Sequence, residues 1–390
     1  MTDGSPNGVA PPELGAQLYR EIIAELQQNG RTTRRPALED AIARTADPVG
    51  AAELANLLAH CCFAEQDYAA ALDACRKWLE LAPDNRLAKD TLLSVLSRLN
   101  RFQEVVDEAT ARLASEPDNA RIHSALAKAF WQLGRIDEAR NAGNECLRLK
   151  DGEANGPAKN LSGVEVPPFD PTNPDKNLIS FSLYGAAPAH CDGAVRNAMA
   201  AQFLYPEWRC RFYVDESVPK RVIDRLLKVG AKVVRVGGLP AGRFGTFWRF
   251  LVADDETVDR YLVRDCDACL NLRERAAVDA WLASDRHFHV MRDGLTHTEA
   301  MLAGMWGGVR SALPPLQQEI IEFCRTAPFS RTADQLFLRE KIWPTVRQSV
   351  LAHDSEFALR DSQPFPTGLN PAGPRVGQAV SNPPVRWTDS

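Results

Sequence analysis

Two aspartates, Asp265 and Asp267, are the residues whose types and spacing best suit chemistry. They stand one residue apart, directly after the apolar stretch 261–264. That stretch predicts a strand, so both carboxylates fall on the turn that leaves it, and ligands of open α/β sheets bind beyond the carboxyl ends of strands. Two carboxylates on one turn can approach a single Mn²⁺ or Mg²⁺ ion and leave positions open for phosphate oxygens. Such an ion would stabilise a departing diphosphate, although Asp-x-Asp is also common in surface turns.

A second pattern overlaps the first, because Cys266 and Cys269 form a CxxC pair. Structural zinc sites and redox centres of this kind usually need further cysteine or histidine ligands at matching spacing. The chain has no second such pair. We therefore do not expect a zinc or disulfide-exchange site at this turn.

The elements that must position the two aspartates alternate between strands and helices from Asn177 onward. The expected strands are 178–183, 210–215, 232–236 and 261–264, and the expected helices are 194–203, 218–229 and 247–254. Short strands separated by helices imply a largely parallel sheet with right-handed crossovers. The expected fold of residues 177–355 is therefore an α/β, Rossmann-like domain.

Residues 51–152 repeat with a countable period. Leu58, Leu92 and Leu126 are 34 residues apart, and Pro83-Asp84-Asn85 recurs as Pro117-Asp118-Asn119. A 34-residue period with small and large residues alternating in two helices resembles the tetratricopeptide repeat. Each helix pair cannot bury its apolar face alone, so the repeats are expected to stack into a curved array with a concave face.

The remaining segments are short. Residues 1–50 form a polar arm and a helical cap, in which Leu14, Leu18 and Ile22 share one helix face. Residues 153–176 are rich in proline and are expected to be a linker, and residues 356–390, rich in proline and glycine, an extended tail.

Composition narrows the function classes. The chain has 390 residues, a formal net charge of −5 and 45% hydrophobic residues, which suits two ordinary globular domains and gives no sign of a nucleic-acid partner. No stretch has the length and apolar character of a transmembrane helix, and the first residues lack the basic and apolar regions of a signal peptide. Nine cysteines without a regular framework suit reduced thiols, so we expect a cytoplasmic protein.

From Phe181 to Asp354 the chain resembles a group of bacterial glycosyltransferases of the GT-A type. The matching motifs are Phe181-Ser182-Leu183-Tyr184-Gly185, Tyr205-Pro206-Glu207-Trp208, Phe212-Tyr213-Val214-Asp215, Phe247-Trp248-Arg249-Phe250, Arg264-Asp265-Cys266-Asp267, Arg273-Glu274, Met291-Arg292-Asp293, Gly304-Met305-Trp306-Gly307, Asp334-Gln335 and His353-Asp354. Three positions depart from the pattern: Cys266 between the aspartates, Ala303 where another glycine is expected, and Gly294-Leu295 in a stretch expected to be richer in His and Pro.

The resemblance implies roles for individual residues. A nucleotide sugar would be the donor, with Asp265, Asp267 and His353 as ligands of Mn²⁺ or Mg²⁺. The nucleotide and its phosphates would contact the six residues Ser182, Tyr184, Gly185, Asp215, Arg249 and Arg264. Asp334 and Gln335 would act at the sugar, although an acid–amide pair at a helix start can equally cap that helix. The acceptor would be a glycan or a protein, and the repeats would recruit the acceptor or a protein partner.

Two other classes compete with this interpretation. A repeat adaptor with a degenerate transferase domain would share the architecture but have no activity. A nucleotidyltransferase would also combine a nucleotide-binding α/β sheet with metal carboxylates, but that class usually opens with a basic, glycine-rich loop after the first strand. Here residues 183–188 contain one glycine and no Lys or Arg.

Overall fold

The computed structural model describes residues 31–326, 332–366 and 374–379, together with Leu18, Glu21, Ile22 and Glu25. The rest of the expected N-terminal arm and cap, including Leu14, lies outside the described residues. The chain divides into two compact units, Met1–Ala142 and Gly143–Ser390, so the boundary falls earlier than residue 152, within helix α8. No helix among the described residues combines the length and apolarity that a bilayer crossing requires.

The first unit is a series of antiparallel helix pairs. Its helices are α2 (Arg35–Arg44), α3 (Pro48–Ala64), α4 (Tyr68–Leu81), α5 (Arg86–Arg98), α6 (Phe102–Leu113), α7 (Ala120–Gln132) and the first part of α8 (Ile136–Glu153). Asn85 and Asn119 cap α5 and α7, each accepting a hydrogen bond from a backbone N–H of the first turn. The small residues Ala71, Val105 and Ala139, which share the 34-residue spacing, are all buried. The helical repeats expected from the period are confirmed.

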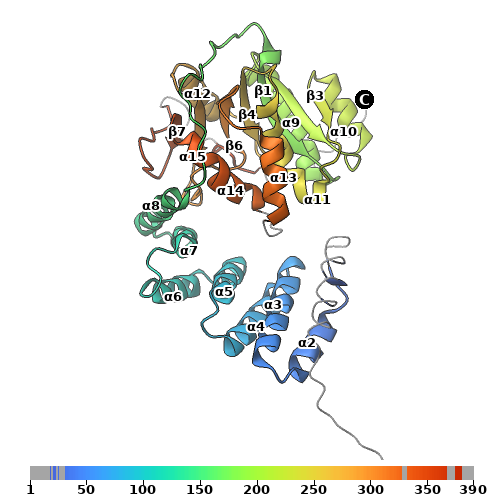
Figure 1. Cartoon of the computed structure of the whole chain (residues 1–390), viewed down its shortest axis with the longest axis vertical. Helices are drawn as coiled ribbons and strands as arrows, with labels where there is room; N and C mark the ends of the chain where they lie inside the picture. The colour runs from blue at the N-terminus through green and yellow to red at the C-terminus, as the bar shows by residue number, and fades with distance from the viewer. Residues whose placement is uncertain are drawn as a thin grey trace, which may run out of the picture. The chain divides into compact units, whose positions relative to one another are not determined.

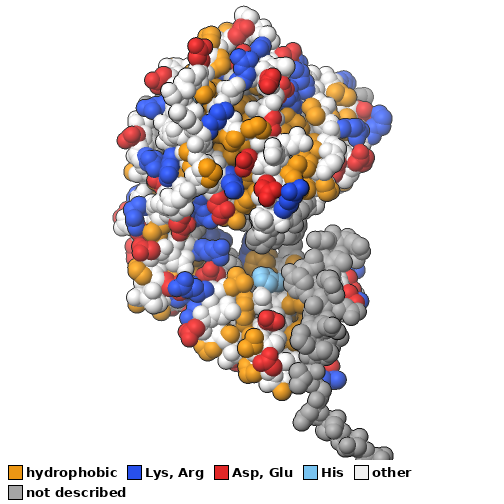
Figure 2. Space-filling model, in the orientation of Figure 1, with side chains coloured by type: hydrophobic (Ala, Val, Ile, Leu, Met, Phe, Trp, Pro, Cys, Tyr) orange, Lys and Arg blue, Asp and Glu red, His pale blue; other side chains and the backbone are white. Residues whose placement is uncertain are grey.

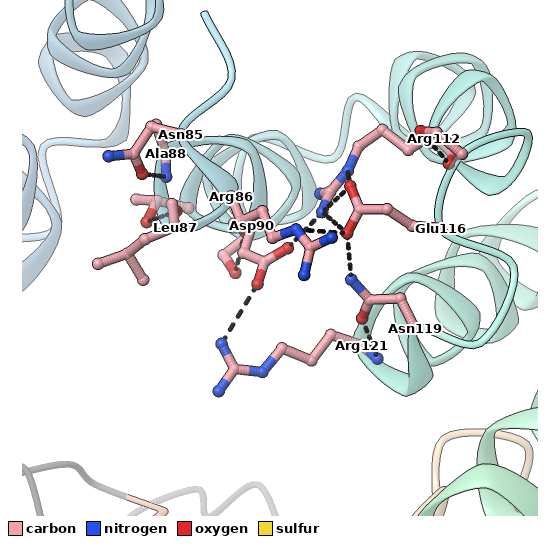
Figure 3. A network of polar contacts seen from close by, with 12 residues as sticks. Asn85, Arg86, Leu87, Ala88, Asp90, Arg112, Glu116, Asn119 and Arg121 are labelled. Carbon is pink, nitrogen blue, oxygen red and sulfur yellow. Dashed lines mark hydrogen bonds and ion pairs between the residues drawn. The ribbon is translucent and has the colours of Figure 1, made fainter. Parts of the chain in front are cut away.

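A buried arginine joins successive repeats (Figure 3). Arg112, at the end of α6, donates to the Asp90 carboxylate on α5 at 2.9 Å and to Glu116 at 3.3 Å. Arg121 adds an ion pair to Asp90 at 3.2 Å, and the Asn119 amide donates to Glu116 at 2.9 Å. The two carboxylates are thus shared between elements of neighbouring repeats, which fixes the stacking of α5 against the α6–α7 turn.

The second unit is an α/β domain (Figure 1). Its strands are β1 (Asn177–Leu183), β2 (Arg209–Val214), β3 (Lys232–Arg235), β4 (Arg260–Arg264), β5 (Phe288–Arg292), β6 (Met305–Val309) and β7 (Val350–Asp354). The sheet order is β3-β2-β1-β4-β6-β5-β7, and only β6 runs antiparallel to its neighbours. The mostly parallel α/β sheet expected from the sequence is confirmed.

Helices cover the sheet. They are α9 (Pro188–Leu204), α10 (Lys220–Lys228), α11 (Ala241–Phe244), α12 (Leu272–Leu282), α13 (Leu316–Thr326), α14 (Ala333–Phe337) and α15 (Trp343–Val346), with the 3₁₀ helices η1 (Pro174–Lys176) and η2 (Gly245–Asp254) and the π-helical turn η3 (Leu338–Ile342). The step from β1 to β2 and the step from β3 to β4 run in opposite directions along the sheet. Right-handed crossovers therefore place α9 and η2 on opposite faces.

Two elements differ from their expected form. α9 begins at Pro188, earlier than the expected residue 194, because proline suits the first turn of a helix. The segment 245–254 is a 3₁₀ helix where an ordinary helix was expected, and its aromatic residues are buried. Phe247 and Phe250 pack against Phe337 on α14, and Phe247 also contacts Phe323 on α13.

The proline-rich segment 153–176 is bound along the α/β unit. The Lys159 N–H donates to Thr345 Oγ1 at 2.9 Å, and the carbonyl of Pro167 accepts from Arg260 at 2.6 Å. The second part of α8 is fastened to the same unit, since Lys150 donates to the carbonyl of Thr298 and Asp151 accepts from Trp343 Nε1. The segment expected to be a linker is thus held against the α/β unit by hydrogen bonds, including one to the carbonyl of Pro167.

The described residues of the expected tail also pack against the α/β unit. Phe357, Phe365 and Val376 are buried, and the N–H of Val376 donates to Asp293 at 2.8 Å. Ala379 forms an isolated antiparallel bridge with Ala268. Residues 374–379 thus lie beside the turn that carries the two aspartates.

The visible face of the α/β unit has no single sign of charge. Acidic and basic side chains are interspersed there (Figure 2).

Candidate functional site

The order of the strands defines one crevice. β1 continues to β2 and β3 on one side, whereas β4 lies on its other side. Such a reversal is the topological switch point at which open α/β sheets bind ligands, beyond the carboxyl ends of the strands. β1 leads into Tyr184 and Gly185 there, and β4 leads into Asp265 and Asp267.

Asp265 lies at the end of β4 with its carboxylate partly open to solvent. Its side chain is 43% exposed, and Oδ1 contacts Arg249 at 2.6 Å. Gly304 lies so close that a Cβ at that position would overlap Asp265 Oδ2. Only glycine therefore permits β6 to begin against this carboxylate. The side chain of Asp267 is half-buried on the same turn.

Arg249 holds two carboxylates together. Its second amino group donates to Asp334 on α14 at 2.9 Å, and both of these side chains are 7% exposed. Burial raises the pKa of the Asp334 carboxyl, while the neighbouring guanidinium opposes that shift. Arg249 is thus enclosed between Asp265 and Asp334. Its side chain bridges the two carboxylates as a salt bridge, the role that the sequence left open beside a phosphate contact.

An aromatic side chain forms the β1 side of the crevice. The Tyr184 ring packs edge-on against Trp248 with centroids 5.7 Å apart, and it lies over Gly245, where a Cβ would meet the ring. About a third of Tyr184 remains exposed, 36%. Burial raises the pKa of its hydroxyl, so the group stays protonated at neutral pH.

The ends of β1 and β2 are joined by a hydrogen-bonded chain. Gly185, with φ of +72°, donates its N–H to Ser217 Oγ at 2.6 Å. Ser217 Oγ and its N–H both donate to Asp215. Ser182 lies deeper, where its hydroxyl accepts from the N–H of Arg249 at 2.9 Å. Asp215 and Gly185 therefore border the crevice, whereas the Ser182 side chain fastens η2 to β1.

Gln335 connects α14 to the loop before β6. In the orientation that satisfies both ends of its amide, nitrogen donates to the carbonyl of Met301 and oxygen accepts from the N–H of Ala303, each at 3.1 Å. This loop leads directly to Gly304. Gln335 thereby helps to fix the approach of Gly304 to Asp265, and Asp334 accepts from the N–H of Gln335 at 2.9 Å.

Two of the expected site residues are not brought to the crevice. Arg264 is buried, with Nε donating to Glu274 on α12 at 2.7 Å. His353 is buried on β7, and β6 and β5 lie between β7 and β4. Its Nδ1 is 2.9 Å from His289 Nε2, and burial lowers its pKa to about 4. His353 therefore does not join Asp265 and Asp267 as a third ligand.

The donor set at the crevice fits a hard divalent ion only in part. Asp265 and Asp267 offer carboxylate oxygens, which suit Mn²⁺ or Mg²⁺, and such ions take their remaining ligands from phosphate and water. Across the described ranges, no group of three or more His, Cys, Asp and Glu side chains is placed to hold a metal. An ion at this site would depend on a phosphate-bearing ligand for the rest of its shell.

Two residues that shape the site, Asn197 and Ser217, were not predicted from the sequence, and the role of a third, Gly304, was predicted only in part. Asn197 on α9 bonds to the backbone of the aspartate turn. Ser217 links Asp215 to Gly185, and its spacing from Asp215 after a strand is typical of an Asx turn, a signal that was available. Gly304 was singled out only as part of a glycine-containing stretch, because its contact with Asp265 spans strands β4 and β6.

Comparison with protein families identifies the repeats. Residues 52–85 and 120–152 match the tetratricopeptide repeat family. The helices α5 and α6 supply the intervening pair. The first unit is therefore a tetratricopeptide-repeat array. A search of curated proteins gives no match to the chain.

Solved structures give low global similarity. MamA of strain AMB-1 is 25% identical over 35% of this chain and 80% of its own, with a TM-score of 0.31. MamA of Desulfovibrio magneticus RS-1 is 21% identical over 36% and 77%, with a TM-score of 0.30. A mutant O-GlcNAc transferase of Thermobaculum terrenum is 18% identical over 64% of this chain and 46% of its own, with a TM-score of 0.39.

Proposed function

We propose that the α/β unit is a metal-dependent glycosyltransferase that uses a nucleotide sugar as donor. The observation that carries the proposal is the position of Asp265 and Asp267 at the switch point, opposite Tyr184 and Gly185. A flat aromatic ring, a backbone with positive φ and two carboxylates at one crevice suit a base, a ribose and a metal-bound diphosphate. The resemblance to GT-A glycosyltransferases supports the same reaction class.

In this account each residue has a distinct task. Tyr184 presents its ring face to the base, and Asp215 lies where a ribose hydroxyl would donate. Asp265 and Asp267 would hold the ion, whose chemistry is to neutralise the diphosphate as the sugar leaves. Tyr184 and Asp215 come from different strands than the aspartates, so the crevice closes around the nucleotide from both sides.

Arg249, Asp334 and Gln335 act as supports for this set. Arg249 fixes the orientation of Asp265 through the 2.6 Å contact and is itself held by Asp334. Gln335 fixes the loop that leads to Gly304. Because the oxygens of Asp334 accept from Arg249 and from the Gln335 N–H, this carboxyl supports the site in preference to acting as a general base.

The tetratricopeptide repeats bind a protein segment in this proposal. Arrays of this kind commonly hold peptides on their concave face. Joined to a transferase, the array would raise the local concentration of a protein acceptor, or of a partner that brings a glycan acceptor, without altering the crevice.

Product analysis tests the function. The full-length protein is incubated with a panel of nucleotide sugars in Mn²⁺ or in EDTA, and products are identified by mass spectrometry. Release of free nucleoside diphosphate that requires the metal is expected. Release of pyrophosphate from a nucleoside triphosphate and a sugar phosphate would instead assign a nucleotidyltransferase. Absence of turnover across the panel, with or without acceptor, would favour the non-catalytic adaptor.

A further inference from the structure

We infer that Asn197 is a positioning residue that sets the conformation of the Asp265–Asp267 turn. The inference depends on the proposed function only for the role of the two aspartates. Asn197 lies on α9, is 1% exposed, and directs its amide at the turn. Its nitrogen donates to the carbonyls of Cys266 at 3.2 Å and Ala268 at 2.7 Å, and its oxygen accepts from the N–H of Leu270 at 3.1 Å.

One side chain thus satisfies three backbone groups of a single loop. A loop that leaves a strand must find partners for its buried N–H and carbonyl groups, and an amide can serve both kinds at once. The three bonds reach from residue 266 to residue 270 and so fix the path of the chain on both sides of Asp267. Neither aspartate is touched by Asn197, which acts through the backbone alone.

α9 can come this close because Gly193 lies one helical turn before Asn197. A Cβ at Gly193 would overlap the carbonyl oxygen of Cys266. The same helix starts just after Tyr184 and Gly185, and Cys191 Sγ lies 3.8 Å from the carbonyl of Gly185. α9 therefore connects the β1 side of the crevice to the β4 side.

The position of Cys266 follows from the three hydrogen bonds that Asn197 makes with residues 266–270. Its thiol is buried and donates to the carbonyl of Ser182 at 3.2 Å. With residue 266 turned into the protein, its neighbours Asp265 and Asp267 are left on the crevice side. Without the hydrogen bonds of Asn197, the turn can rotate. Rotation would bring the Cys266 thiol toward solvent and would move both carboxylates.

The first test needs no ligand. Full-length protein is treated with a thiol reagent under native conditions, and labelling of Cys266 is followed by peptide mapping. Asn197→Ala is expected to speed Cys266 labelling by about tenfold or more, because three hydrogen bonds to the turn are removed. Gly193→Ala, which displaces the Cys266 carbonyl, should act in the same direction. Unchanged labelling in both variants would overturn the inference.

A matched control separates positioning from general loss of stability. Asn177 is also 1% exposed and donates to three backbone carbonyls, those of Asp170, Asn173 and Glu207, but it lies at the amino end of β1, away from the crevice at the carboxyl ends of the strands. Asn177→Ala should lower the melting temperature to a similar degree as Asn197→Ala and leave Cys266 protected. Equal labelling in the two variants would show only global opening and would overturn the inference.

The second test measures Mn²⁺ affinity by electron paramagnetic resonance, with uridine and guanosine diphosphates as probes. Asn197→Ala should weaken Mn²⁺ binding about 10- to 100-fold, as for the loss of other groups that orient metal ligands, whereas Asn177→Ala should not. A wild-type protein that binds no Mn²⁺ with any probe would contradict the metal site of the proposed function. In that case Cys266 labelling still decides the role of Asn197.

Discussion

Each unit of the molecule buries an arginine between two carboxylates, but the two clusters serve different purposes. Arg112 in the repeats lies between Asp90 and Glu116, with side chains 8%, 17% and 10% exposed. Arg249 in the α/β unit lies between Asp265 and Asp334, and here one carboxylate, Asp265, is 43% exposed. In the first cluster both carboxylates are largely buried, whereas in the second one carboxylate, Asp265, opens into the switch-point crevice.

The difference shows that residue types alone do not identify a site. The Arg112 cluster joins elements of successive repeats (Figure 3). The Arg249 cluster has nearly the same chemistry, yet it stands at the carboxyl end of β4, where a ligand would be bound. Location in the fold, together with the exposure of Asp265, distinguishes the candidate site from a structural clamp.

The largest effect on folding is expected from the choice of the first residue in a truncated chain that contains the α/β unit. A chain beginning at Gly143 should fold, whereas one beginning at Asn177 should aggregate, because it lacks the contacts of Lys150, Asp151 and Lys159 with the α/β unit. Each lost hydrogen bond costs about 0.5–3 kcal/mol, and the net stability of a domain is only about 5–15 kcal/mol. Circular dichroism and size-exclusion chromatography check this. A folded, monomeric chain from Asn177 would restore the interpretation of 153–176 as a linker.

Replacing each arginine in turn should show that only the Arg249 cluster is needed for activity, whereas both clusters stabilise their units. Arg249→Met and Arg112→Met should each cost about 3–5 kcal/mol in their own unit, because buried carboxylates lose their partner. Only Arg249→Met should also abolish donor hydrolysis. Hydrogen exchange resolved by peptide reports the stability of each unit, and nucleotide release reports activity. Loss of hydrolysis in Arg112→Met as well would break the distinction between the clusters.

Acid should weaken the α/β unit through the buried pair His289 and His353. Burial lowers both pKa values, that of His353 to about 4. An unfolded histidine takes up its proton near pH 6.5. The unfolded state therefore binds more protons between these values, and stability falls as the pH drops. From about pH 6.5 to about pH 5 the loss attributable to His353 is about 2 kcal/mol.

His353→Gln keeps a hydrogen-bonding side chain beside His289 and should flatten this pH dependence. The measurement is denaturant unfolding of the α/β unit at several pH values, for wild type and variant. Identical slopes in the two proteins would mean that His353 is protonated as easily in the folded state as in the unfolded one.

The smallest effect concerns the repeats. Deleting residues 1–142 should leave donor hydrolysis intact and raise the KM for a natural acceptor about tenfold or more, because tethering is lost. Initial rates at varied acceptor concentration measure this. A truncated protein that keeps full transfer efficiency would leave the repeats with a scaffold role only.

Much of the fold could be predicted because its signals are local. The 34-residue spacing of Leu58, Leu92 and Leu126 predicted the repeats, and the apolar run before Asp265 predicted β4. The rest depends on long-range contacts. His353 was expected beside Asp265 from the family resemblance, and nothing in the sequence gives the strand order β4-β6-β5-β7 that separates the two residues. The proline content of 153–176 indicates an extended chain but not the surface to which it is bound.

Only some of the residues at the candidate site could be predicted from the sequence. Asp265 and Asp267 were found from their place after a strand, and Tyr184, Gly185 and Asp215 from a family resemblance. Asn197 was not found, because its partners at 266–270 are far along the chain and a buried asparagine on a helix has no local signature. Arg249 was predicted as a charged residue of the site, but its ion pair with Asp334 could be known only from the fold.

The central claim is that Asp265 and Asp267 support metal-dependent cleavage of a nucleotide sugar. The most direct measurement is donor hydrolysis by the full-length Asp265→Ala/Asp267→Ala protein in Mn²⁺, with the double variant's folding verified by circular dichroism. We expect a loss of about 100-fold or more, the scale seen when charge stabilisation of a leaving group is removed, and an equal loss when wild type is treated with EDTA. A folded double variant that hydrolyses the donor at the wild-type rate would contradict the account.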